Sequence, residues 1–236
     1  MKKPYLLIII SLLFFIAFLL LSKYEDRPAI RNLDFAVTVK VQDRVTKLCG
    51  TRCDSFFEDF GFFASPVFSV IAVFVFASLT LIEGSHPSKL RRMRSFLSVI
   101  VIFVSFAVLT FVEIYAKTSV RHPAPPFFML KNPTTIFPQF YINEQFSYPS
   151  GHAARATFLV ILLFSTIQQF NPTSLKLRGA GNKTMWNKKL WSGIGLGLYL
   201  GLIFFSRIYL GHHWLSDVMG GWLLGGATGI LSVVLF

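Results

Sequence analysis

Residues 5–22, YLLIIISLLFFIAFLLLS, form a run of 18 positions without a charged side chain. A helix of about 20 apolar residues spans the hydrocarbon core of a bilayer, so this run predicts a membrane span. Lys2 and Lys3 precede it, and no small-x-small cleavage site follows it. We therefore interpret the run as an uncleaved first span rather than a signal peptide.

Five further apolar runs along the chain have the same character. They cover residues 60–82, 96–116, 150–167, 190–207 and 214–236. The chain is 53% hydrophobic, contains 27 Phe and has a mean hydropathy of +0.59. Because the apolar residues come in blocks rather than at a helical or strand period, the sequence favours an all-helical membrane protein over any soluble fold. The sequence predicts an all-α, polytopic membrane protein: a six-transmembrane-helix bundle forming a single domain over residues 1–236.

The net charge of +12 lies mainly in the loops. No nucleic-acid-binding motif accompanies the charge, so we expect membrane lipids, and no nucleic acid, as partners. Two short basic loops, 85–94 and 171–189, share a side with Lys2 and Lys3. The positive-inside rule then places both termini in the cytoplasm. We predict a multi-pass protein of the cytoplasmic (inner) membrane.

Two longer loops fall on the other, outer or periplasmic side. Residues 23–59 carry seven basic and seven acidic side chains and are interpreted as a folded or interfacial loop. Residues 117–148 are rich in Pro and Phe, which predicts an irregular loop against the membrane interface. Cys49 and Cys53 lie in the first of these loops. They form a disulfide if that side is oxidising, and two unpaired thiols are the open alternative.

Polar residues that border the spans are the candidates for function, because charge at membrane depth is costly. Three clusters stand at the ends of spans that share the outer side. They are Lys117, Arg121 and His122; Ser150, Gly151 and His152; and Ser206, Arg207, His212, His213 and Asp217. Any one of these residues alone would be interpreted as an interfacial anchor. Together they predict an anion site.

The phosphate-binding part of this site follows from helix and side-chain chemistry. Ser150 can cap a helix start, and Gly151 lets a ligand approach the free backbone N–H groups there. Arg207 and Lys117 add positive charge, and the guanidinium fork matches phosphate oxygens.

The reactive part centres on a histidine. His213 and Asp217 are four residues apart and share a helix face, so the carboxylate can fix the imidazole tautomer and leave the other nitrogen free to attack phosphorus. His152 would then protonate the leaving oxygen. His212, His213 and Asp217 are alternatively ligands of a metal, but tight metal sites generally need three or four converging ligands. We expect no metal and no cofactor.

Two ionisable residues lie within the predicted spans. Glu113 is four residues before Lys117 and can neutralise it. Arg155 lies one turn into the fourth span and needs a partner, for which Glu113 is a candidate.

Two signatures give the sequence a family resemblance. Pro149-Ser150-Gly151-His152, and Ser206-Arg207 followed at fixed spacing by His213 and Asp217, resemble the second and third signatures of the type-2 phosphatidic acid phosphatase superfamily. The third signature, with Gly220-Gly221-Trp222 after it, is similar to the bacterial membrane branch. The resemblance covers about residues 117–225.

The resemblance implies metal-independent hydrolysis through a phosphohistidine. By position, His213 is the nucleophile, Asp217 its orienting carboxylate and His152 the general acid. Lys117, Ser150, Gly151 and Arg207 hold the phosphate.

The first signature departs from the family pattern. The family has Lys, six residues and Arg-Pro, but counting from Lys117 leads to Ala124-Pro125. Arg121 comes three residues early. Either Arg121 reaches the phosphate, or Arg155 substitutes, or one ligand is missing; we favour Arg121.

These features together predict a lipid phosphate phosphatase. The substrate classes are phosphatidic acid, phosphatidylglycerol phosphate, an isoprenyl diphosphate or lipid A. The alternatives are a phosphotransferase that passes the phosphate to another acceptor, and an inactive member of the fold that binds or transports lipid.

Overall fold

A computed structural model describes residues 3–84, 89–131, 146–169 and 183–235. The described residues form helices and connecting loops and no strand, which confirms the prediction of an all-helical protein. The α-helices are α1 (Lys3–Tyr24), α2 (Pro28–Cys49), α3 (Thr51–Gly61), α4 (Pro66–Gly84), α5 (Lys89–Val120), α6 (Gly151–Gln169), α7 (Lys183–Tyr209) and α8 (Leu215–Leu235), and the short 3₁₀ helices are η1 (Phe62–Ala64) and η2 (Phe127–Met129).

The predicted spans correspond to the long helices α1, α4, α5, α6, α7 and α8. Among the described residues, four helices (α1, α5, α7 and α8) are long and apolar enough to cross a membrane by themselves. A fifth span is reached when α3, η1 and α4, which bend by 41° at Ser65, are taken as one. The sixth, α6, has a shorter apolar stretch and lies largely inside the bundle.

The bend before α4 has a local cause. Ser65 has an extended backbone and its Oγ accepts a hydrogen bond from the backbone N–H of Phe68 (3.2 Å). Pro66 follows at the first helical position, where its missing N–H costs nothing. The chain therefore stops one helix and starts another at this point.

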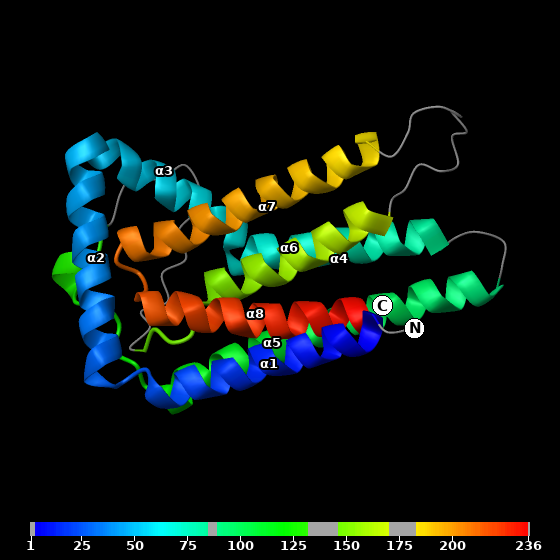
Figure 1. The fold of residues 1–236 in the computed structure, drawn as a ribbon, viewed down its shortest axis with the longest axis horizontal. Helices are drawn as coiled ribbons and strands as arrows, with labels where there is room; N and C mark the ends of the chain where they lie inside the picture. The colour runs from blue at the N-terminus through cyan, green and yellow to red at the C-terminus, as the bar shows by residue number, and fades with distance from the viewer. Residues whose placement is uncertain (1–2, 85–88, 132–145, 170–182, 236) are drawn as a thin grey trace.

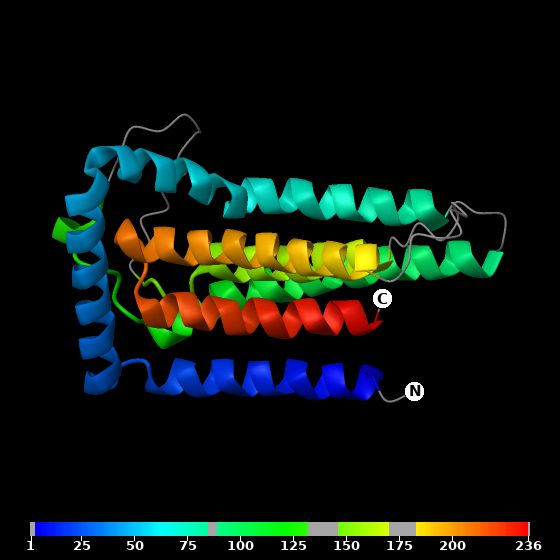
Figure 2. The ribbon, with the colours of Figure 1, turned by 45° about the horizontal axis from the view of Figure 1, so that its top comes forward.

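The segment 23–59 is helical rather than a loop, which corrects the sequence interpretation. Helix α2 crosses one end of the bundle, roughly perpendicular to the long helices (Figures 1 and 2). Its buried residues, Asp34 and Thr38, are polar, so apolar patterning did not reveal the helix. Cys49 and Cys53 form a disulfide at its junction with α3, which decides between the two alternatives left open by the sequence.

Helices α6 and α8 form the centre of the bundle. Gly221 and Gly225 of α8 face α6 so closely that an added Cβ would lie 2.3 Å from the Ser150 carbonyl oxygen and 2.2 Å from that of Ala154. Helices in membranes associate by such close contact of small residues. Because the backbones touch, the starts of α6 and α8 are held at one depth.

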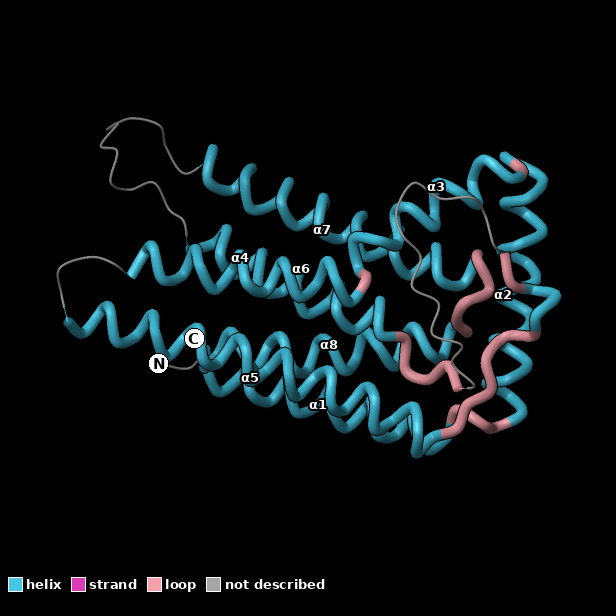
Figure 3. Tube along the Cα trace, turned by 180° about the vertical axis from the view of Figure 1, so that it is seen from behind, coloured by secondary structure: helices cyan, strands magenta, loops and turns pink. Residues whose placement is uncertain are grey.

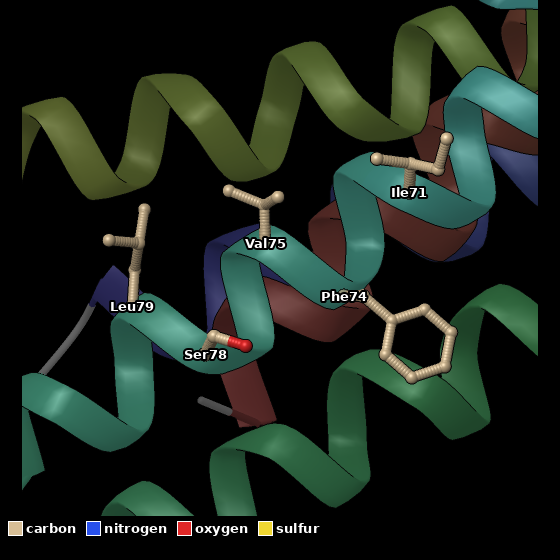
Figure 4. Close-up of a pocket in the computed structure, with 5 residues that line it drawn as sticks. All are labelled: Ile71, Phe74, Val75, Ser78 and Leu79. Atoms are coloured by element: carbon tan, nitrogen blue, oxygen red, sulfur yellow. The ribbon is translucent and has the colours of Figure 1, made fainter.

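The outer faces of the long helices are apolar and exposed, as expected for a surface that meets lipid. A shallow hollow on this surface is lined by Ile71, Phe74, Val75, Ser78 and Leu79 of α4 (Figure 4). Only one of these side chains is polar, so the hollow has the character of lipid-facing surface and offers no catalytic chemistry.

The two ends of the bundle differ. Figures 1 and 2 show both described chain ends at the end opposite α2, and most described loops gather beside α2 (Figure 3). The ends of α4, α5, α6 and α7 that flank residues 85–88 and 170–182 also lie opposite α2. Most of the predicted basic loops, and residues 132–145 of the predicted aromatic loop, lie outside the described residues.

Candidate active site

His213 lies in the short turn between α7 and α8, at the α2 end of the bundle. Gly211 starts this turn with a φ of +71°, and a Cβ there would lie 2.2 Å from the Met129 carbonyl oxygen. Only glycine meets both conditions without strain. The backbone N–H groups of His212 and His213 then donate to the Arg207 carbonyl (3.1 and 3.2 Å), which closes the end of α7.

Asp217 lies one turn into α8 and is fully buried. Its Oδ2 accepts a hydrogen bond from the backbone N–H of Trp214 (2.8 Å) and so caps α8. The same Oδ2 is 3.7 Å from Nδ1 of His213. The two side chains share a face as their spacing predicts, but this distance is too long for a hydrogen bond. Nδ1 of His213 is buried without a hydrogen-bond partner among the described residues.

His122 is the side chain that does hydrogen-bond Asp217. Its Nδ1 is 2.8 Å from Oδ1 of Asp217, and its Nε2 is 3.2 Å from Oε2 of Glu25. His122 is only 3% exposed. Sequence reasoning placed His122 in a cluster but gave it no role, and it missed Glu25, which follows α1. The sequence held one signal for a role of His122: it directly follows Arg121, the arginine that is out of register with the first signature.

Helix α2 supplies a further carboxylate that the sequence did not single out. Asp34 accepts hydrogen bonds from the backbone N–H and the hydroxyl of Ser216 (2.8 and 2.6 Å). It therefore satisfies a free N–H group at the start of α8. Burial raises the pKa of Asp34, against the hydrogen bonds from Ser216.

Ser150, Gly151 and His152 open α6 beside this cluster. The Ser150 backbone N–H donates to the Asp217 carbonyl (2.9 Å), which ties the starts of α6 and α8 together. A Cβ at Gly151 would lie 2.0 Å from Oε1 of Glu113, so this glycine makes room for a side chain of α5. His152 lies within the electrostatic reach of Arg207 and His213.

Arg207 is buried at the end of α7 and has several partners. Its guanidinium donates to the Phe57 carbonyl (3.3 Å) and lies 3.1 Å from Nδ1 of His212. It is also 3.5 Å from Oε2 of Glu58 on α3. A Cβ at Gly61 would lie 1.9 Å from this guanidinium. Helix α3 thus supplies a hydrogen-bond acceptor, a carboxylate and, at Gly61, the space for the Arg207 guanidinium. The sequence did not indicate this role of α3.

The two cations of the first signature differ in their placement. Lys117, in the last turn of α5, interacts electrostatically with Glu113 and Asp217. Arg121 is exposed, has a φ of +57°, and makes no hydrogen bond or ion pair within the part of the chain that the structure describes. Arg155 is paired with Glu113, with 2.6 Å between the two side chains. The sequence had named Glu113 as a candidate partner of Arg155.

The two histidines next to Asp217 have opposite electrostatic environments. Burial lowers the pKa of His213, helped by the charges of Lys117 and Arg207 and opposed by Asp217. Burial also acts to lower the pKa of His122, but the hydrogen bond to Asp217 and the charges of nearby carboxylates outweigh it and raise the pKa. His213 is therefore neutral, as a nucleophile must be, while His122 favours its protonated form.

The same side chains do not form a recognisable metal site in the described part of the chain. Within residues 3–84, 89–131, 146–169 and 183–235, no three His, Cys, Asp or Glu side chains are grouped as ligands of one ion. That the site needs neither metal nor cofactor stays a prediction.

Comparison with known proteins gives three similarities. The family model described as PAP2 superfamily matches residues 95–236. An undecaprenyl-diphosphatase from Sulfolobus acidocaldarius is 30% identical over 141 residues, which are 58% of this chain. The chain spans about half (53%) of the length of that curated relative.

A solved structure extends the similarity to nearly the whole fold. The crystal structure of the first transmembrane PAP2-type phosphatidylglycerolphosphate phosphatase from Bacillus subtilis has a TM-score of 0.65 to this chain. The alignment covers 98% of this chain and 94% of the other, at 18% sequence identity. At this identity the likeness concerns the fold, including the helices before residue 95 that the family model does not reach.

Proposed function

The chain belongs to the PAP2 superfamily, and from this premise we propose that it is an integral membrane phosphatase that hydrolyses lipid phosphates through His213. The observation that carries the proposal is the gathering of His213, Asp217, His152 and Arg207 at one end of the bundle. Their chemistry is that of nucleophile, carboxylate, acid and phosphate ligand.

In the first step, Nε2 of His213 attacks phosphorus and the bond to the lipid oxygen breaks. Asp217 faces Nδ1 of the same ring and stabilises the positive charge that develops there. His152 gives its proton to the leaving oxygen; the negative charge of the bound phosphate favours the protonated imidazole. In the second step, water attacks the phosphohistidine, His152 accepts a proton from that water, and orthophosphate leaves with His213 restored.

The phosphate is held where α6 begins. The backbone N–H groups of the first turn of α6, from Gly151 on, have no partner within the helix and suit an anion, and Arg207 and Lys117 supply positive charge. We keep Arg121 as the third cation of the cradle. Its side chain is exposed, and an exposed arginine side chain can turn toward a bound phosphate.

The proposed substrate is a lipid, because the cluster lies at the end of helices whose outer faces are apolar. The four classes named above remain the panel: phosphatidic acid, phosphatidylglycerol phosphate, isoprenyl diphosphate and lipid A. We propose to test an isoprenyl diphosphate and phosphatidylglycerol phosphate first, because the similar proteins are an undecaprenyl-diphosphatase and a phosphatidylglycerolphosphate phosphatase.

We further propose that the site faces the outer side of a cytoplasmic membrane, with both termini in the cytoplasm. The Cys49–Cys53 disulfide lies at the same end as His213, and disulfides persist in oxidising compartments. A thiol reagent that does not cross membranes tests this on intact cells. Labelling of Cys49 and Cys53 after mild reduction supports the orientation; labelling only after lysis overturns it.

The function itself is tested with purified protein in detergent and the four lipids, with and without a chelator. We expect chelator-insensitive release of orthophosphate that is absent in His213→Ala, and a phosphorylated enzyme intermediate that is stable to alkali. Equal release of orthophosphate by wild type and His213→Ala would contradict the mechanism. Phosphate recovered on a second lipid instead of in solution would make the protein a phosphotransferase.

A further inference from the structure

The buried carboxylate of Asp217 has its closest side-chain hydrogen bond with a residue outside the family signatures. Oδ1 is 2.8 Å from Nδ1 of His122, whereas the nearest approach to His213 is 3.7 Å from Oδ2. Oδ2 already accepts a hydrogen bond from the Trp214 backbone. The direction in which Asp217 points is therefore set by His122 and Trp214 rather than by His213.

The backbone of His122 is anchored on both sides. Its carbonyl accepts a hydrogen bond from the backbone N–H of Ser147 (2.9 Å), just before α6. The carbonyl of the next residue, Pro123, accepts one from the indole N–H of Trp214 (2.8 Å), the residue that follows His213. Arg121, with its positive φ, turns the chain inward at the end of α5. His122 is thus tied to both helices that carry the proposed catalytic residues.

The second ring nitrogen of His122 faces another carboxylate. Nε2 is 3.2 Å from Oε2 of Glu25, and both side chains are buried, at 3% and 4% exposure. A neutral imidazole carries one N–H, so only the doubly protonated ring can donate toward both Asp217 and Glu25. The contact with Glu25 is an ion pair whose alignment falls short of a hydrogen bond. Asp34 adds a third negative charge nearby.

We propose that His122 is a positioning residue of the reaction: held by Glu25, it orients the Asp217 carboxylate so that Oδ2 faces Nδ1 of His213. The proposal rests on the proposed function of His213 as the nucleophile. Without His122, one oxygen of a fully buried carboxylate loses its donor, and Asp217 turns toward another cation such as Lys117. The segment that lacks the signature arginine thus positions the Asp217 carboxylate through His122, in addition to carrying Arg121.

Two variants of His122 separate its contact with Asp217 from its contact with Glu25. In His122→Asn, the amide nitrogen stands at the position of Nδ1 and can still donate to Asp217. In His122→Gln, the amide nitrogen stands near the position of Nε2 and can bond only Glu25. We expect His122→Asn to keep kcat within a few-fold of wild type. We expect His122→Gln to lower kcat about a hundredfold with KM nearly unchanged, because a misplaced reacting group costs about that much.

The readouts distinguish this proposal from a structural role and from failure of the proposed function. Thermal unfolding in detergent shows whether each variant folds. If His122→Gln does not fold, Glu25→Gln provides a second test, with an expected fall in kcat between those of His122→Asn and His122→Gln. Equal losses in His122→Asn and His122→Gln, or changes confined to KM, overturn the positioning role. Activity that survives His213→Ala overturns the proposed function instead, whatever the His122 variants do.

Discussion

Arg155 of α6 and Glu113 of α5 form a buried ion pair, with 2.6 Å between Nη1 and Oε2. Arg155 also reaches the Ala64 carbonyl with its Nε (3.5 Å), so it links three elements near the start of α6. Gly151 leaves the space that the pair occupies. Arg155, one of the alternatives for the missing signature arginine, is therefore engaged by a carboxylate in this structure.

The first prediction concerns this pair. Removing one partner of a buried pair costs about 3–5 kcal/mol, because the other charge stays buried. Glu113→Met should cost more than Arg155→Met, since Glu113 also neutralises Lys117 and its loss leaves two cations. The free energy of unfolding from an SDS titration measures both. The double variant should recover part of the loss; strict additivity would contradict the pairing.

The second prediction concerns the contact between α6 and α8. Gly225→Ala places a methyl group 2.2 Å from the Ala154 carbonyl oxygen, so the helices must separate. Overpacking of this kind costs about 1–3 kcal/mol, which should appear as a lower unfolding temperature in detergent. Gly201→Ala on α7 is the matched control, because its Cβ meets no atom within 4 Å. A neutral or stabilising effect is expected there, and equal losses would argue against the close contact.

The third prediction is an opposite pH dependence for two histidines. The raised pKa of His122 means that its protonation stabilises the fold below its unfolded pKa of about 6.5, and that this stability is lost as pH rises through the folded pKa. The pKa of His213 is lowered, mainly by burial, so His213 costs stability as pH falls below about 6.5.

Thermal unfolding of His122→Asn and His213→Asn between pH 5 and about 9 tests both signs. The amount by which the unfolding temperature of His122→Asn falls below that of the wild type should shrink as pH rises. The unfolding temperature of His213→Asn should rise relative to that of the wild type as pH falls. Parallel curves for the two variants would contradict the assigned charge states.

The fourth prediction concerns Glu58, whose carboxylate lies 3.5 Å from the Arg207 guanidinium. If Arg207 binds the phosphate, Glu58 competes for the same cation and repels the ligand. Glu58→Gln should lower the inhibition constant of orthophosphate about threefold, as expected for one unit charge at the edge of a hydrated site. Asp43→Asn, on an exposed residue of α2 paired with Lys47, is the control. A weaker inhibition in Glu58→Gln would mean that Glu58 chiefly holds Arg207 in place.

Local patterns in the sequence were enough to predict the helices of the bundle. Runs such as 5–22 must be helical in a membrane because no water is available to satisfy the backbone. The spacing of His213 and Asp217 was equally informative, since a helix puts residues four apart on one face. Helix α2 escaped prediction because the side chains that it buries, such as Asp34, are polar.

What the sequence determined by itself is therefore the membrane-spanning bundle, the PAP2 resemblance and the residues of two signatures. Only the tertiary structure decided the partners of those residues: Glu25 and His122 beside Asp217, and Glu58 beside Arg207. The reason is that each pair joins segments far apart in the sequence, and which charges meet depends on how the backbones pack. The close contact of α8 with α6, set by Gly221 and Gly225, fixes that packing; their Gly-x-x-x-Gly spacing marks a face for close contact but does not say which helix packs against it.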